Sequence, residues 1–442
     1  MGGANLGDAR LNRRLARVAE RLRAQPGASI PVASGGWAET QAAYRLLAHE
    51  DVDWEAVLTP HWDCSIEWMR GQPVVLCVQD STELNYTPQP GIAGLGPLSD
   101  LRQHGLYVHP TLAVTPDGVP LGVLDAWRWT RDRETFGEDK PHGPIEAKES
   151  MRGLEGFERC AEWATPLPDT RWVYVADREC DIHEFMVRTR RHPQMDGLIR
   201  AAQDRKLAEG DTLWDRLAQA PVPGEVSFTL PARPNRSSRP VVLTVRAERV
   251  TLHPKDGAPV TVTALRAREE SPPAGVEPLD GRLLTHCAAD TLAQAVEWIQ
   301  GYGARWNIEV FFRILKTGCR VEALPLSTLD RLEPALALYF IIAWRIQYLT
   351  VLGRVTPALP GDAVLDPAEG QAVYVAIHRR PPPATPPPLS AMLGWIARLS
   401  GYLGRKCDGP PGPQALWIGL QRARDLAWGM QLAADLHAES TG

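Results

Sequence analysis

The chain of 442 residues is 44% hydrophobic and has a formal net charge of −5, which excludes a protein that binds nucleic acid over a uniformly basic surface. Its length predicts two or three domains with a sizeable core. The seven cysteines form no Cys-x-x-Cys pair and are odd in number, which argues against a zinc site or a disulfide framework and favours a reducing compartment. The longest apolar run, at 335–343, is too short to span a bilayer. We therefore expect a soluble, cytoplasmic, multidomain protein in which local patches bind any polyanion.

Residues 1–70 are predicted to form a small helical domain. Leucine and valine recur at helical spacing over residues 9–24, arginines cover the other faces, and Asp8 is a suitable N-cap. Two more helices are predicted at about 37–48 and 53–69. A basic amphipathic helix is more often a solvated surface than a DNA reader, so the pattern alone leaves its role open.

Residues 71–350 are predicted to form an α/β domain. Two short, continuous apolar runs are typical of strands buried on both faces, and Thr-Pro-Asp-Gly at 115–118 predicts a hairpin. The expected elements are a strand at 74–78, a hairpin at 106–126, a helix at about 145–164, a strand at 172–176, a helix at about 181–191 and a strand at 197–200. This order indicates an α/β sheet with one antiparallel portion.

Two aspartates follow the buried strands. Asp80 comes after the strand at 74–78, and Asp177 comes directly after the strand at 172–176. In open α/β sheets, functional groups collect beyond the carboxyl ends of the strands, so both are candidate site residues. An aspartate at such a position is also a common turn or cap residue.

The region from about 205 to 290 interrupts this domain with an antiparallel β insertion, because alternating apolar runs there are separated by Pro, Gly, Asn and Ser. Helices are expected after it, at 291–301, 302–316 and 328–353, and then at about 390–404 and 413–436 within a helical C-terminal domain, 351–442. The last helix has an apolar face broad enough for a partner chain, and packing back on its own domain is equally compatible with the pattern.

Four polar residues stand out in the helix expected at 302–316: Tyr302, Arg305, Glu309 and Lys316. At about 100° per residue, they fall on one face of an α-helix, within roughly 60° of one another. The apolar residues around them predict that this helix is largely buried, and burying charged groups without partners is costly. The pattern leaves two interpretations open: an internal ladder of ion pairs, or a phosphate or metal site.

Three carboxylates would converge if this helix crossed the two strand ends: Asp80, Asp177 and Glu309. Hard oxygen ligands select Mg²⁺ or Mn²⁺. Two such ions about 3.5–4 Å apart can activate the attacking oxygen and stabilise the leaving oxygen at a phosphodiester. Arg305 and Lys316 would then hold flanking phosphates, and Tyr302 can donate a hydrogen bond and stack. This interpretation explains the two aspartates, for which an internal ladder has no role.

Several stretches of the chain, distributed nearly from end to end, resemble the DDE transposases of bacterial insertion sequences. The resemblance is to the Tn5-like branch, which is defined by Tyr-x2-Arg-x3-Glu-x6-Lys. The matching stretches are Leu6-Gly-Asp-Ala-Arg10, Ala43-Tyr-Arg45, Asp80-Ser-Thr, Asp177-Arg-Glu-x-Asp-Ile-His183 and the signature from Tyr302 through Lys316-Thr-Gly318. The spaced signature together with the Asp177 motif is highly specific.

The resemblance implies an RNase H-like, retroviral-integrase-like catalytic core, 71–350, interrupted by the β insertion. It also implies an N-terminal domain, 1–70, that reads the transposon end, and a C-terminal dimerisation domain, 351–442. The implied partners are double-stranded DNA, at both the terminal repeats and the target, and a second copy of the chain, without a membrane.

The implied reaction is cut-and-paste transposition: hydrolysis at the transposon end, a hairpin formed by the freed 3′-OH, opening of that hairpin and joining to target DNA. The implied metal-binding triad is Asp80, Asp177 and Glu309, with two Mg²⁺ ions per site, for which Mn²⁺ can substitute. The implied DNA contacts are Tyr302, Arg305, Lys316 and Arg200 near the hairpin, Trp306 beside them, and Arg10 and Arg14 in the end-binding helix.

Two departures from the family pattern shape these expectations. Gly281 stands where the family has a tryptophan that wedges against a flipped base, so hairpin formation is less securely implied than cleavage. The chain also begins close to Leu6, which would fit a misplaced start, a trimmed chain or an inhibitor-like short form. The competing hypotheses are a catalytically weak or inhibitory DNA-binding dimer and an RNase H-like nuclease without end specificity. A glycosidase with paired carboxylates fits less well, because it gives Arg305 and Lys316 no role.

Overall fold

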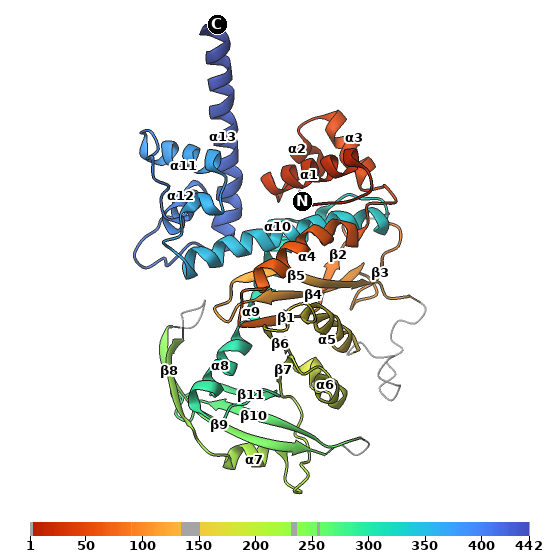
Figure 1. Cartoon of the computed structure of the whole chain (residues 1–442), viewed down its shortest axis with the longest axis vertical. Coiled ribbons are helices and arrows are strands. Elements are labelled where there is room, and N and C mark those ends of the chain that lie inside the picture. Colours follow the sequence, from red (N-terminus) through yellow and green to blue (C-terminus); the bar gives the residue numbers. More distant parts are fainter. Residues whose placement is uncertain (1–2, 90, 134–150, 231–236, 254–256, 442) are drawn as a thin grey trace.

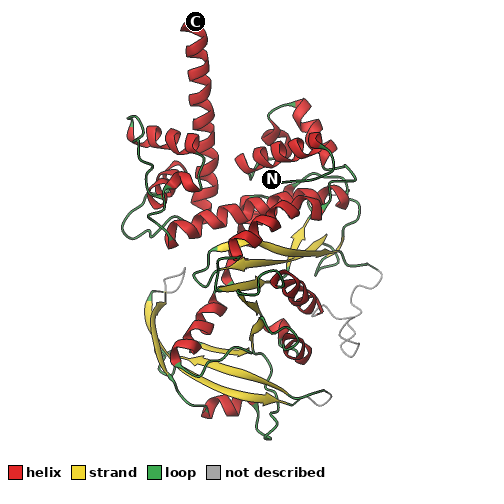
Figure 2. Ribbon diagram, viewed as in Figure 1, coloured by secondary structure: helices red, strands yellow, loops and turns green. Residues whose placement is uncertain are grey.

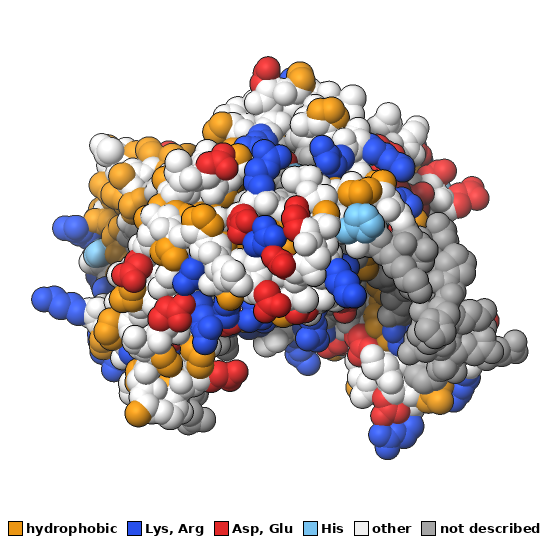
Figure 3. All heavy atoms as spheres, turned by 90° about the horizontal axis from the view of Figure 1, so that it is seen from below, with side chains coloured by type: hydrophobic (Ala, Val, Ile, Leu, Met, Phe, Trp, Pro, Cys, Tyr) orange, Lys and Arg blue, Asp and Glu red, His pale blue; other side chains and the backbone are white. Residues whose placement is uncertain are grey.

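The computed structural model describes residues 3–89, 91–133, 151–230, 237–253 and 257–441. The helices from both ends of the chain lie at the top of the view, and one large sheet with flanking helices, formed by the middle of the chain, lies below them (Figures 1 and 2). In the view from below, acidic and basic side chains intermingle over the surface (Figure 3), in keeping with the small net charge.

The N-terminal unit contains the helices α1 (Ala9–Ala24), α2 (Ile30–Ser34), α3 (Trp37–Leu46) and α4 (Trp54–Met69). Three of these confirm the predicted helices. The predicted cap forms, with Asp8 accepting from the Arg10 N–H at 2.6 Å, and Asp53 caps α4 in the same way, accepting from the Ala56 N–H at 2.7 Å. The five-residue α2 was not predicted, because it is too short to show an apolar period. Helix α4 leaves this unit and packs on the sheet.

The described residues contain an eleven-stranded sheet. Its strands are β1 (Val74–Gln79), β2 (Thr82–Asn85), β3 (Gly96–Pro97), β4 (His104–Val114), β5 (Pro120–Trp129), β6 (Arg171–Ala176), β7 (Met195–Arg200), β8 (Gly224–Leu230), β9 (Arg239–Leu252), β10 (Val260–Arg268) and β11 (Asp280–Thr285). Strands β1, β6 and β7 are parallel neighbours, and β4 is antiparallel to both β1 and β5. The predicted hairpin is the β4–β5 turn, where the Gly118 N–H donates to the Thr115 carbonyl at 2.8 Å and Gly118 takes a φ of +82°.

Strand β1 is buried on both faces, as its continuous apolar run predicts. Leu76 and Val78 join the core cluster under the helices that carry the signature residues, whereas Val75 and Cys77 join the cluster on the opposite face. The opposite face is covered by α5 (Met151–Ala164), α6 (His183–Thr189) and α7 (Leu213–Gln219). The predicted helix at 145–164 lies partly outside the described residues, and α7 was not predicted.

The β insertion does not form a separate sheet. Strand β11 pairs antiparallel with β7, so β8–β11 continue the central sheet at its β7 edge. In the register of this pair, Leu283 lies opposite Arg200. The insertion is therefore built directly onto the strand that ends in one of the predicted DNA contacts.

Four helices form the C-terminal region: α10 (Leu329–Val355), α11 (Pro367–His378), α12 (Leu389–Leu399) and α13 (Pro413–Thr441). In the part of the chain that the structure describes, α10 alone is long and apolar enough to cross a membrane, yet 78% of its most apolar window is buried in the protein, as in a core helix. The first half of α13 packs on the helices beside it, whereas its second half projects from the body (Figure 1) with Trp428 and Leu436 exposed. The first half thus confirms packing on its own domain, and the second half leaves apolar side chains exposed.

Candidate active site

Asp80 and Asp177 lie at the same edge of the sheet. Strands β1 and β6 are parallel with Val78 opposite Val175, so both chains leave the sheet side by side. Asp80 Oδ1 accepts from the Ser81 N–H at 2.9 Å, and Asp177 Oδ1 accepts from the Glu179 N–H at 2.9 Å, at the start of a 3-10 turn. One oxygen of each carboxylate is held by its own turn.

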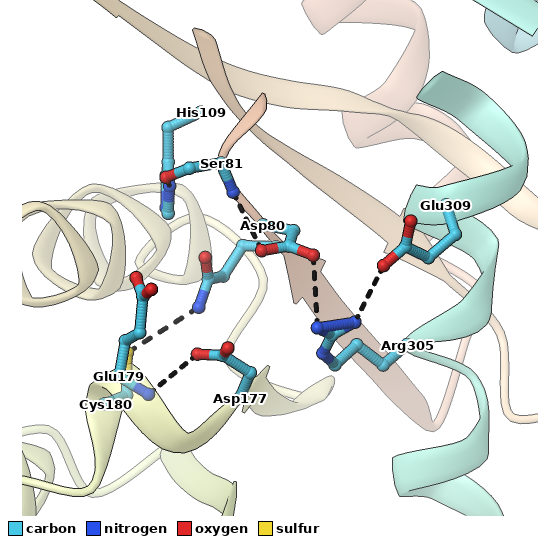
Figure 4. A network of polar contacts seen from close by, with 9 residues as sticks. Asp80, Ser81, His109, Asp177, Glu179, Cys180, Arg305 and Glu309 are labelled. Atoms are coloured by element: carbon cyan, nitrogen blue, oxygen red, sulfur yellow. Dashed lines mark hydrogen bonds and ion pairs between the residues drawn. The ribbon is translucent and has the colours of Figure 1, made fainter. Parts of the chain in front are cut away.

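Glu309 comes to these aspartates from the other direction. It lies in the first turn of α9 (Trp306–Arg313), which packs over β1 and β4. Between the two elements lies Arg305, whose guanidinium donates to Asp80 Oδ2 at 3.1 Å and to Glu309 Oε1 at 3.5 Å (Figure 4). Arg305 thus joins Asp80 and Glu309, whereas Asp177 is connected to them through the effect of its charge on Asp80.

Electrostatics also connect the members of this group. Burial raises the pKa of Asp80 to about 6, Arg305 lowers it, and Asp177 and Glu309 raise it. Burial raises the pKa of Tyr302, while Arg305 and Arg200 act in the opposite direction. The phenol therefore lies within electrostatic reach of the same charges.

The chemistry of the donors fits hard divalent cations, because Asp80, Asp177 and Glu309 offer carboxylate oxygens alone. Burial is the main reason that the pKa of Asp80 is raised, and the negative charges of Asp177 and Glu309, which a cation would balance, raise it further. Within the described residues, however, no three His, Cys, Asp or Glu side chains are arranged to hold a metal ion. The Arg305 guanidinium stands between two of the carboxylates, so holding a metal requires Arg305 to leave Asp80.

The prediction of one continuous helix over 302–316 is wrong. Helix α8 (Leu292–Gly303) ends two residues before α9 begins, and a π-helical turn, Ile314–Gly318, follows α9. Glycines at 301 and 303 are weak helix formers, and the Cys319 N–H reaches back five residues to the Ile314 carbonyl at 2.8 Å. The four signature residues consequently do not share one face of a single helix.

Lys316 lies in the π-helical turn and belongs to a different part of the surface. Burial lowers its pKa, and Glu322, Glu83 and Glu309 act in the opposite direction. Within the described part of the chain its ammonium forms no ion pair, so it takes no part in the contacts of Arg305. The internal-ladder interpretation holds for Arg305 and Glu309 and fails for Lys316.

The remaining predicted contacts lie at varying distances from the carboxylates. Arg200 ends β7 and is exposed, and Trp306 is 62% exposed at the start of α9, an exception in a stretch that is largely buried as predicted. Arg10 and Arg14 lie on α1 in the N-terminal unit, where Glu39 pairs with Arg14 at 3.8 Å. The structure does not bring these two arginines to the carboxylate group.

Gly281 lies on β11 opposite Ala267, with only the Ala267 carbonyl within reach of an added Cβ, at 4.0 Å. The next residue, Arg282, places its guanidinium 4.5 Å from the centre of the Trp214 ring. An aromatic ring therefore lies beside this strand, although it belongs to α7.

Two supporting residues were missed in the sequence. His109 is buried on β4, its Nδ1 lies 2.8 Å from the Ser81 Oγ, and burial lowers its pKa to about 4 (Figure 4). Asp181 is fully buried and accepts from the backbone N–H of Ala202 at 2.7 Å and from Arg205 at 2.7 Å. The sequence signal for His109 was a histidine inside a predicted apolar strand. The signal for Asp181 was its place in the motif that begins at Asp177.

Comparison with known families agrees with this geometry at both ends of the chain. Residues 1–52 match the family model described as transposase DNA-binding, and residues 341–439 match the model described as the transposase Tn5 dimerisation domain. The carboxylate group lies in the residues between these two matches. Together the two matches indicate a Tn5-like transposase.

Proposed function

We propose that this transposase is a metal-dependent DDE enzyme that cuts DNA at transposon ends and joins the freed ends to target DNA. The observation that carries the proposal is the Arg305 bridge between Asp80 and Glu309, next to which the charge of Asp177 acts on Asp80. DNA cleavage and strand transfer are what membership of the family implies, and the two terminal matches support a DNA partner and a homodimer.

We assign the core to the RNase H-like class. The strand order β5–β4–β1–β6–β7, with β1, β6 and β7 parallel and β4 antiparallel, supports this assignment. The two aspartates follow the neighbouring parallel strands β1 and β6, which is the edge where open α/β sheets place functional groups. In cells we place the protein in the cytoplasm, on DNA when it acts.

Asp80, Asp177 and Glu309 would hold two Mg²⁺ ions, or Mn²⁺ in their place, which would supply activation of the attacking oxygen and stabilisation of the leaving oxygen. Above neutral pH Asp80 is ionised, since its pKa is about 6. Arg305 turns from Asp80 to a phosphate next to the cleaved bond, where its planar fork binds two oxygens. Lys316, Tyr302 and Arg200 hold the neighbouring phosphates and the strand end.

In the first step, water attacks the phosphorus at the transposon end, the P–O3′ bond breaks, and the 3′ oxygen leaves as a hydroxyl. We infer that this 3′-OH then attacks a phosphorus of the opposite strand, where the P–O3′ bond breaks and releases the flanking DNA with a free 3′-OH. The resulting hairpin is hydrolysed before the 3′ end joins the target. Because Gly281 supplies no wedge, Trp214 and Arg282 are the side chains we propose for stabilising an extruded base beside β11.

A catalytically weak or inhibitory dimer is the second candidate. It is favoured by one observation: Arg305 already neutralises two of the three carboxylates. In such a protein Arg305 would stay bound to Asp80 in the presence of DNA and Mg²⁺.

End-labelled duplexes that carry the DNA sequences flanking the gene decide between these functions. With Mg²⁺, the wild type should nick these duplexes at one position and join them to a plasmid, whereas Asp80→Asn and Glu309→Gln should bind without nicking. Asp290→Asn, at an exposed carboxylate before α8, is the matched control and should nick normally. Binding without nicking by the wild type would support the inhibitory dimer, and equal nicking of a mixed-sequence duplex would support a general nuclease.

A further inference from the structure

A polar groove lies beside the π-helical turn, separate from the three carboxylates Asp80, Asp177 and Glu309. Its volume is about 490 Å³. One wall is formed by Lys316, Thr317 and Arg320, and the other by Asn85 and Gln89 at the end of β2 and in the segment after it. Of these residues only Lys316 belongs to the family signature.

Arg320 has a backbone conformation that few side chains adopt. Its φ of +52° and ψ of +41° place it in the left-handed region, directly after Cys319, the C-cap of the π-helical turn. Glycine commonly occupies this position after a helix, because it alone takes this conformation without strain. Among the described non-glycine residues only Arg320 and Arg379 have a positive φ in this range. Strain retained at one residue points to a use for its side chain.

The charges in the groove fit one phosphodiester. Within the described residues the side chains of Lys316 and Arg320 form neither hydrogen bonds nor ion pairs, and both line the groove. The one acid of the lining, Glu322, accepts a hydrogen bond from the Asn85 N–H at 2.8 Å. Two cations and one carboxylate leave a single positive charge, which one phosphodiester balances.

The groove also lies between two parts of the protein that meet DNA. At one end the charge of Lys316 interacts with that of Glu309. At the other end the Arg320 Cδ lies 3.9 Å from where a Cβ on Gly27 would be, in the residues that match the transposase DNA-binding model. A strand that leaves the carboxylate group along Lys316 therefore passes Arg320 before it reaches the N-terminal unit.

We propose that this groove is a second site for the DNA backbone, in which Arg320 binds a phosphodiester next to the one held by Lys316. The inference rests on the proposed function, because the phosphate is that of the DNA being cut. The side chain of Arg320 contributes two donors in a fixed fork, and the left-handed backbone directs it into the groove.

The substitution Arg320→Gly gives the sharpest test, because it removes both the cationic side chain and the backbone strain. Arg320→Gly should melt at the same or a higher temperature than the wild type, yet bind a transposon-end duplex about three- to ten-fold more weakly in Ca²⁺. The slope of log affinity against log salt should fall by about 0.9, the value of one phosphate contact. Arg320→Gln, which keeps the strain and removes the charge, should lose the same affinity.

Arg379 supplies a matched control, since it is an exposed arginine with a φ of +56° after α11. Arg379→Gly and Arg379→Gln should leave the affinity and the salt slope unchanged. If the Arg320 variants bind as tightly as these controls, or if Arg379 variants lose as much affinity, the phosphate site is wrong.

A methylphosphonate scan then identifies the contact. Each duplex carries one neutral linkage, and one position should weaken binding by the wild type but not by Arg320→Gly. If every linkage that matters to the wild type matters equally to Arg320→Gly, the proposed contact is excluded. Nicking by the wild type in Mg²⁺ is scored separately, so loss of the proposed function and loss of the Arg320 contact give different results.

Discussion

The guanidinium of Arg305 bridges Asp80 and Glu309, at 3.1 Å and 3.5 Å, and so connects a residue after β1 to a residue of α9 that lies 229 positions further along the chain. A cation therefore holds together two carboxylates that we propose as metal ligands. The bridge makes the positions of Asp80 and Glu309 depend on Arg305. In the proposed reaction a metal binds the carboxylates and a phosphate binds Arg305 instead.

Replacing Arg305 with glutamine should separate metal binding from catalysis. Removal of the guanidinium leaves the carboxylates without a competing cation, so Mn²⁺ measured by calorimetry should bind about three- to ten-fold more tightly. Nicking should nevertheless fall by at least about ten-fold, because a phosphate contact is lost. Weaker Mn²⁺ binding would show that Arg305 organises the carboxylates instead of competing for them.

The raised pKa of Asp80 predicts a pH-dependent stability. Its folded pKa of about 6 lies above the ordinary value of 3.8, so the folded protein holds this proton more tightly than the unfolded chain. The stabilisation is complete below about pH 4 and is lost as the pH rises through 6. In EDTA, Asp80→Asn should therefore be more stable than the wild type at pH 8, by about 1–2 kcal/mol, and the difference should shrink at pH 5. Equal melting temperatures at both pH values would contradict this.

Glu309→Ala should abolish nicking and leave end binding nearly intact. The side chain is 44% exposed and, within the described residues, forms an ion pair with Arg305 alone, so its loss should cost little stability. Gel-shift titration and a nicking assay on the same preparation measure the two quantities. A parallel loss of binding and nicking would mean that Glu309 serves mainly to hold the structure.

Lys316→Ala should weaken end binding and lower the salt slope by about 0.9, because one phosphate contact is removed. Since burial already lowers the pKa of this ammonium, its removal should not destabilise the fold. Lys406→Ala, at an exposed lysine in the C-terminal region, is the control. An unchanged salt slope for Lys316→Ala would exclude the contact.

His109 should act as a positioning residue through Ser81. His109→Gln and Ser81→Ala should each lower the nicking rate by about ten-fold while leaving KM for the duplex unchanged, because Asp80 is held by the Ser81 N–H. The double variant should be no slower than either single one, since both changes break one hydrogen bond. His61→Gln, at another buried histidine, which accepts from the Val123 N–H at 3.0 Å, should lower stability without this kinetic effect.

Local signals in the sequence predicted most elements of the fold. The apolar run before Asp80 predicted a strand buried on both faces because alternate residues of β1 do face two different clusters. The break between α8 and α9 and the π-helical turn were missed because apolar spacing near 3.6 residues continues across both. The pairing of β11 with β7 was also missed, since sheet order depends on contacts far apart in the chain.

For the candidate site, spacing identified the carboxylates and Arg305 as neighbours. It could not show with which carboxylates Arg305 forms ion pairs. That choice depends on Asp80, which is 225 residues away. His109 was overlooked for a similar reason: its meaning comes from a hydrogen bond to Ser81 across two strands.

The junction of β11 with β7 means that the insertion is not a removable module. Excising residues of β8–β11 would expose the backbone of β7 beside Arg200 as a free edge, which invites pairing with other chains and aggregation. A shortened enzyme would therefore need another strand paired with Leu198–Arg200 before its nicking activity could be compared with that of the wild type. In this protein the insertion covers the edge of the strand that ends in Arg200.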